Sequence, residues 1–133
     1  MSITEKLILL AVMFFCHIVD DFYLQGLLAQ MKQREWWRRN APGRLYRNDH
    51  VMALFEHAFS WSFVMSLPLL VVAVRTDNEG LMQLLLVGYI VNTIIHAYID
   101  NRKANRQVIN LIQDQSAHFV QIIVLWATAL HLL

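Results

Sequence analysis

The sequence predicts an all-α protein, a four-helix transmembrane bundle with both termini on the non-cytoplasmic side of the membrane. Composition is the first observation behind this prediction. Hydrophobic residues make up 57% of the chain and charged residues 16%, whereas soluble domains have about 45–50% and about 25%. The second observation is that long stretches carry no charge, while the connections between them carry many. We expect one integral-membrane domain that covers residues 1–133.

Four segments approach the ~20 helical residues that are needed to cross about 30 Å of hydrocarbon. The second segment is the clearest, because residues 58–74 contain no charged side chain. The first is apolar up to Val19, and it becomes a full span only if Asp20 and Asp21 face inward. The expected spans are 4–30, 50–75, 80–101 and 106–132.

Lys and Arg in the connections predict the orientation of the helices. The connection 31–49 carries six of the eleven basic residues, and the connection around Arg102 carries three more. An excess of Lys and Arg marks the cytoplasmic side. We therefore expect a multi-pass membrane protein with a basic cytoplasmic loop 31–49 that faces anionic lipid headgroups. Trp36, Trp37 and Tyr46 lie among these arginines; beside a membrane span this pattern favours interfacial anchors over stacking on nucleic-acid bases, so no nucleic-acid partner is expected.

Polar residues inside the spans are the candidate functional residues. An aspartate near the centre of a membrane helix costs roughly 2.5–3.5 kcal/mol, so each one needs a compensating partner. Three His–Asp pairs are spaced i,i+4, which places both side chains of a pair on one helix face. The second span adds His57, with His50 as the alternative. The predicted metal ligands are His17, Asp21, His57, His96, Asp100, Asp114 and His118.

This set has more ligands than one tetrahedral ion needs, and it suits one or two divalent transition-metal ions. Imidazole and carboxylate ligands suit zinc, which we expect first, and also iron or manganese. Two alternatives do not need a metal. The pairs could be hydrogen-bonded contacts that fix the packing of the helices, or they could form a proton relay.

The motifs also occur in a recognisable order along the chain. They are His17-x-x-x-Asp21-Phe22-x-Leu24-Gln25 followed by Lys32, then His57, His96-x-x-x-Asp100 and Asp114-Gln115-x-x-His118. This series resembles an uncharacterised family of bacterial and phage membrane proteins, domain of unknown function 3307. The resemblance implies a multi-pass protein of the bacterial inner (cytoplasmic) membrane, and it implies no settled activity.

Two classes of function follow from these residues. The first is a metal-dependent hydrolase that acts on a lipid or another membrane-associated substrate, with Asp20 or Glu56 as the catalytic base. The second is a non-enzymatic membrane module: a metal or proton carrier, or a factor that binds a host membrane protein. A homodimer is compatible with either class.

Overall fold

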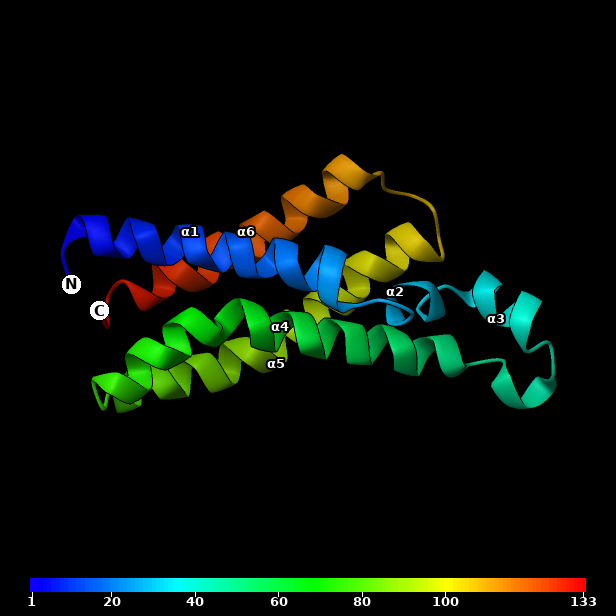
Figure 1. Cartoon of the computed structure of the whole chain (residues 1–133), viewed down its shortest axis with the longest axis horizontal. Helices are drawn as coiled ribbons and strands as arrows, with labels where there is room; N and C mark the ends of the chain where they lie inside the picture. The colour runs from blue at the N-terminus through cyan, green and yellow to red at the C-terminus, as the bar shows by residue number, and fades with distance from the viewer.

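The computed structural model describes all residues of the chain, and every regular element in it is helical (Figure 1). The all-α prediction is confirmed. A π-helical turn, η1 (Asp20–Leu24), continues the first helix, and a 3-10 turn, η2 (Arg44–Tyr46), lies in the first long connection. The α-helices are α1 (Ile3–Val19), α2 (Leu28–Met31), α3 (Arg34–Asn40), α4 (Asp49–Arg75), α5 (Glu79–Ala104) and α6 (Leu111–Ala129).

The long helices α1, α4, α5 and α6 lie along one another, and both termini are at the same end of the molecule (Figure 1). At this end the Met1 amino group donates a hydrogen bond to the Leu133 carbonyl oxygen, at 3.4 Å. The short elements α2, α3 and η2 lie at the opposite end, together with the α5–α6 connection (Figure 1). The two connections that are rich in Lys and Arg therefore share one end of the molecule.

The starts of three long helices are set by side chains that cap their free backbone N–H groups. Ser2 and Glu5 form a capping box at the start of α1, and Asn110 and Gln113 form another at the start of α6. The Asn78 side chain accepts a hydrogen bond from the backbone of α5. These caps fix where the polar and apolar faces of each helix begin.

Three of the expected spans are confirmed as long and apolar enough to cross a membrane: Ile3–Leu24, Arg44–Arg75 and Glu79–Ala104. The fourth expected span, 106–132, contains α6, which is not among them. Its hydropathy is lower because polar side chains crowd its first turns: Gln113, Asp114, Gln115, His118 and Gln121.

The π-helical turn η1 lets two consecutive acids face the interior. In a regular α-helix consecutive side chains point about 100° apart, and the wider π turn rearranges this local register. Asp20 is fully buried and Asp21 is largely buried, while Phe22 and Leu24 are exposed. The inward placement of both acids is as predicted. Gly26 follows with φ of +48°, a conformation that glycine adopts without steric cost, and the chain turns there into α2.

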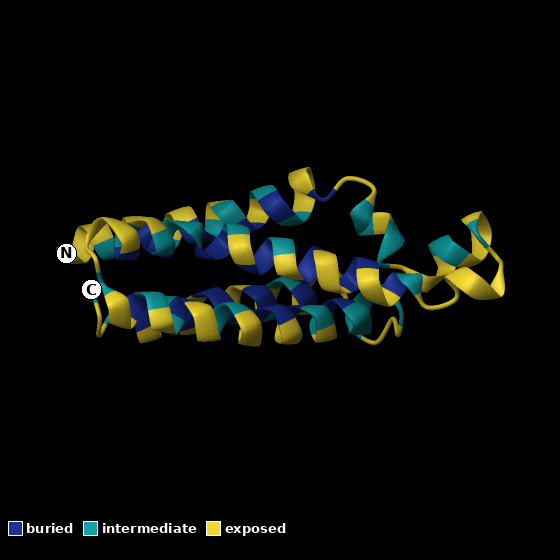
Figure 2. Ribbon diagram, turned by 90° about the horizontal axis from the view of Figure 1, so that it is seen from below, coloured by how far each residue is buried: buried dark blue, intermediate teal, exposed yellow.

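Buried residues line the interior and exposed residues lie around the outside (Figure 2). The buried residues divide into an apolar half and a polar half. The apolar half lies towards the termini and holds one cluster of buried side chains, to which α1, α4, α5 and α6 all contribute. The buried histidines and aspartates lie towards the other end. Trp61, which is fully buried on α4, belongs to the apolar cluster and also touches the histidines.

Candidate metal centre

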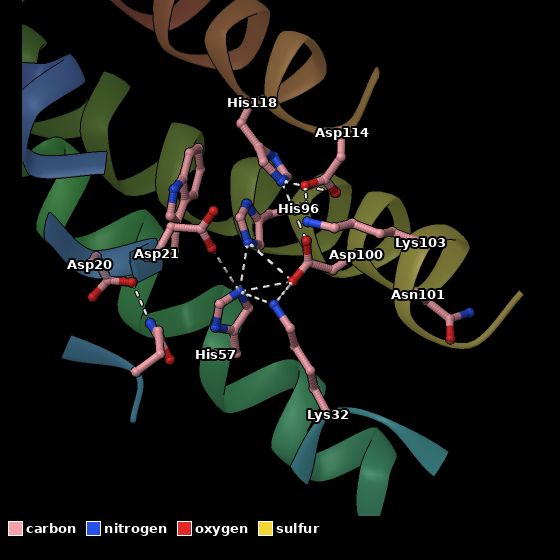
Figure 3. Close-up of polar contacts among 12 residues, drawn as sticks. Asp20, Asp21, Lys32, His57, His96, Asp100, Asn101, Lys103, Asp114 and His118 are labelled. Atoms are coloured by element: carbon pink, nitrogen blue, oxygen red, sulfur yellow. Dashed lines mark hydrogen bonds and ion pairs between the residues drawn. The ribbon is translucent and has the colours of Figure 1, made fainter. Parts of the chain in front are cut away.

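Four separate elements bring His and Asp side chains together in the polar half (Figure 3). Most of the predicted ligands meet here, and each is buried or nearly so. They are Asp21 from η1, His57 from α4, His96 and Asp100 from α5, and Asp114 and His118 from α6.

His57 lies at the centre of this cluster. Its Nε2 atom is 2.8 Å from Asp100 Oδ2, 3.2 Å from His96 Nε2 and 3.4 Å from Asp21 Oδ1. Two sets of three residues, which we call the donor groups, each have ligand atoms within 4.8 Å of one another: Asp21, His57 and His96, and His96, Asp100 and His118. Two ligand atoms of a tetrahedral zinc ion lie roughly 3.3 Å apart, given Zn–N distances of about 2.0–2.1 Å. The spacing in the cluster is therefore compatible with metal ligands, and it is also that of hydrogen bonds and ion pairs.

The hydrogen bonds of His118 determine which of its nitrogens carries the proton. Gln121 Nε2 donates to the Asn92 carbonyl oxygen (3.2 Å) and to Asn92 Oδ1 (3.0 Å), so Gln121 Oε1 faces His118. His118 Nδ1 donates to that oxygen at 3.2 Å, so Nε2 is an acceptor in the neutral imidazole and a second donor in the imidazolium. This Nε2 atom lies 3.3 Å from Asp100 Oδ1 and 3.5 Å from Asp114 Oδ1. His118 Nε2 and Asp114 Oδ1 have no hydrogen-bond partner. His118 Nε2 and two carboxylate oxygens thus face one another in a buried place, where either a proton on Nε2 or a metal cation between the three atoms would offset the burial.

Two lysines approach the cluster from the basic end. Lys32 Nζ lies 2.5 Å from Asp100 Oδ2 and 2.9 Å from His57 Nε2, and Lys103 Nζ lies 2.6 Å from Asp114 Oδ2. From the sequence, Lys103 is identified only as a basic residue of a connection, and Lys32 also as a residue of the motif series. Lys103 could have been found, because it follows Asp100 at i,i+3 on the same helix. Lys32 reaches the cluster through the turn at residue 26, which sequence spacing does not reveal.

His17 is near the cluster but lies outside both donor groups. Trp61 Nε1 donates to His17 Nδ1 at 2.6 Å, and His17 Nε2 then donates to Gln115 Oε1 at 3.0 Å. Gln115 Nε2 in turn donates to Asp21 Oδ2 at 2.9 Å and to Asp114 Oδ2 at 3.1 Å. Both ring nitrogens of His17 are hydrogen-bonded, so neither is free to bind a metal. His17 orients Gln115, which in turn orients the carboxylates of Asp21 and Asp114.

Three aromatic rings form a stack beside the cluster. The Trp61 and His96 ring centroids are 4.2 Å apart with planes 24° apart, and the His96 and His118 centroids are 4.0 Å apart with planes 25° apart. Trp61 follows His57 at i,i+4, so the sequence held a signal that these two side chains share a face. The stack fixes the plane of His96 between two neighbours.

The geometry can be compared with what is known of related chains. A model of the family described as "Protein of unknown function (DUF3307)" matches residues 9–133. The chain belongs to this family. No curated protein and no solved structure matches the chain. The matched range includes both donor groups, and the description of DUF3307 gives no activity, so a function has to be argued from the geometry of the cluster.

The two residues expected to act as a base in this DUF3307 protein are not in the donor groups. Asp20 accepts hydrogen bonds from Gln25 Nε2 and from Ser60 Oγ, the latter at 2.8 Å. Glu56 is exposed on α4 and makes no hydrogen bond or ion pair with the cluster. Neither carboxylate has a hydrogen bond or ion pair with a donor-group residue, and the assignment of either as a base stays a prediction.

The alternative ligand on α4, His50, is buried in the first turn of the helix, about two turns before His57. Its Nε2 atom lies 3.4 Å from Arg34 Nε, and it belongs to neither donor group. His57 is the histidine of α4 that the structure brings to the cluster.

Proposed function

We propose that this DUF3307 protein is a multi-pass membrane protein that binds one or two divalent metal ions in its buried His/Asp cluster. One observation carries the proposal. His118 Nε2 faces oxygens of both Asp100 and Asp114, and two of these three atoms lack any hydrogen-bond partner. A divalent cation would satisfy all three atoms at once and would offset the burial of the carboxylates.

The residues present fit a transition-metal ion. His57, His96 and His118 would bind through Nε2, and Asp100 faces His57 with Oδ2 and His118 with Oδ1. Because an imidazole nitrogen binds a single ion, His96 can serve only one of the two donor groups. Asp100 has an oxygen for each side, so it suits a carboxylate shared between two ions. Zinc is the ion we expect first, with iron or manganese also compatible with these ligands.

The enzyme that fits such a centre is a metal-dependent hydrolase acting on a membrane-associated substrate. A divalent ion bound there would supply a Lewis acid for an ester or phosphoryl oxygen. The Lys32 and Lys103 side chains are 14% and 36% exposed, whereas the ligands beneath them are buried. These two ammonium groups would hold the negative group of a substrate at the basic end of the cluster.

The same two lysines favour a second candidate, a charge network without metal. The Lys32 and Lys103 ammonium groups already pair with Asp100 and Asp114. Such a network would fix the helices or pass protons between His and Asp side chains. The two candidates differ in whether the protein holds a metal ion.

Elemental analysis is the direct test of the metal centre. Protein purified in detergent without chelator is expected to carry one or two transition-metal ions per chain. Removing the ion should lower the melting temperature, and adding zinc back should restore it, since a ligand at 100 times its Kd stabilises by about 2.7 kcal/mol. Magnesium at the same concentration serves as the control ion. A folded, metal-free preparation whose melting temperature zinc does not change would contradict the proposal.

We further propose that the basic end faces the cytoplasm and its anionic lipids, because nine of the eleven Lys and Arg residues are in the two connections at that end. Alkaline phosphatase fused after Leu133 should then be active and green fluorescent protein fused there should be dark. The same two reporters inserted at Gly43, in the basic loop, are the control and should give the opposite pattern. Bright fluorescence from the fusion after Leu133 would overturn this orientation.

A further inference from the structure

The basic loop holds a pocket that is separate from the donor groups. It lies between α3 and η2, at the end of the molecule opposite the termini (Figure 1), and its volume is about 430 Å³. No residue of the His/Asp cluster lines it. The side chains that matter for its chemistry are Arg34, Trp37, Arg38, Arg44, Tyr46 and Arg47.

The charges around this pocket are not balanced within the protein. Glu35 pairs with Arg38 at 3.4 Å and with Arg39 at 3.1 Å. Arg34, Arg44 and Arg47 have no carboxylate within ion-pair distance, yet all three line the same hollow. Guanidinium groups in one hollow repel each other, and a shared anion with several oxygens removes that repulsion.

The walls of the pocket are held in place by contacts of their own. Trp37 Nε1 donates to the Met31 carbonyl oxygen at 2.6 Å, and the Trp37 ring stacks on Tyr46 with centroids 6.3 Å apart and planes 16° apart. The Asn105 side chain accepts from the Arg34 backbone N–H at 2.7 Å and donates to the Lys32 carbonyl oxygen at 3.1 Å. The loop is thus attached to the end of α5, so the pocket is formed before any ligand arrives.

We propose that this pocket is a binding site for a phosphate group, presented either by a phospholipid headgroup or by a soluble phosphate. Arginine binds phosphate oxygens with paired N–H donors, which is the chemistry offered by Arg44, Arg47 and the terminal nitrogens of Arg34, whose Nε donates to His50. The aromatic wall suits a position at the membrane surface, where Trp and Tyr side chains are enriched. The proposal does not depend on the metal centre, because the two sites share no residue.

Two double variants with equal loss of charge test the site in the full-length protein. Arg44→Gln with Arg47→Gln removes two lining groups, and Arg39→Gln with Arg106→Gln removes two exposed basic groups that do not line the pocket. In one arm, native mass spectrometry measures phosphatidylglycerol retained from mixed micelles with phosphatidylcholine. In the other arm, isothermal titration measures the binding of inorganic pyrophosphate.

We expect wild type to bind at least one of the two probes, and the probe that binds identifies the source of the phosphate. The pocket variant should lose affinity by at least about tenfold, as expected when charged hydrogen bonds are removed. The control variant should stay within about twofold of wild type, because its two residues lie outside the pocket. Equal losses in both variants would show general electrostatic attraction and overturn the proposal. So would a wild-type protein that binds neither probe.

Discussion

Replacing Asp100 by Asn is expected to abolish metal binding. Asp100 is the one carboxylate whose two oxygens face different histidines of the cluster, His57 and His118. Asn keeps the shape but removes the negative charge, so the affinity for zinc should fall by more than about 100-fold. Competition with a chromogenic chelator measures the affinity, and elemental analysis measures the metal that remains. The variant should still fold, since a neutral amide costs less to bury in a membrane than a carboxylate.

A matched control and a second variant distinguish a metal centre from a charge network. Asp77→Asn changes the same chemical group in the α4–α5 turn, far along the chain from the cluster, and metal content should not change. Lys32→Met removes the ammonium group that contacts Asp100 Oδ2 and His57 Nε2 but keeps the length of the side chain. If the cluster is a metal centre, this variant keeps its metal and binds it more tightly, because a competing cation is gone. Loss of stability in Lys32→Met, with no metal in either protein, would favour the charge network instead.

Trp61→Ala is expected to have the largest effect on stability. Trp61 is fully buried, its ring stacks on His96, and its Nε1 donates to His17. The cavity and the unpaired His17 nitrogen together should cost about 3 kcal/mol. Thermal unfolding in detergent should show a large fall in melting temperature, and the metal affinity should fall as well because His96 loses one neighbour of its ring.

Two further variants separate the contributions of Trp61. Trp61→Phe keeps an aromatic ring beside His96 but removes the donor to His17, so an intermediate loss is expected. Trp126→Ala is the control, since Trp126 is only partly buried and its Nε1 donates to the Lys6 carbonyl oxygen, near the termini. An equal loss in Trp61→Ala and Trp126→Ala would show that the stack does not have the structural role assigned to it.

The long helices could be predicted well because their signal is local. The second expected span, 50–75, corresponds to α4 at Asp49–Arg75, and the third, 80–101, lies within α5 at Glu79–Ala104. A charge-free apolar stretch and a capping residue depend only on neighbours in sequence. The fourth span shows the limit of this reasoning, because α6 places many polar side chains in its first turns and its hydropathy falls accordingly.

The cluster could be predicted in part for the same reason. Spacing of i,i+4 indicates which side chains share a helix face. Because the polar faces of α5 and α6 both point into the interior, His96, Asp100 and His118 lie close together. Spacing does not state which ring nitrogen is free. His17 shares a face with Asp21, yet both of its nitrogens are occupied by Trp61 and Gln115. Nor does spacing reveal a chain that folds back, which is how Lys32 reaches Asp100.

The division of the interior into an apolar half and a polar half determines from which end an ion or a proton could reach the His/Asp cluster. Towards the termini, the interior beside Trp61 is filled by the apolar cluster that extends to Ala129, with the buried hydroxyl groups of Ser62 and Ser66 among it. Towards the basic end, the cluster is covered by two partly exposed lysines. A group that binds at the cluster would therefore reach it most directly from the basic end, beside Lys32 and Lys103.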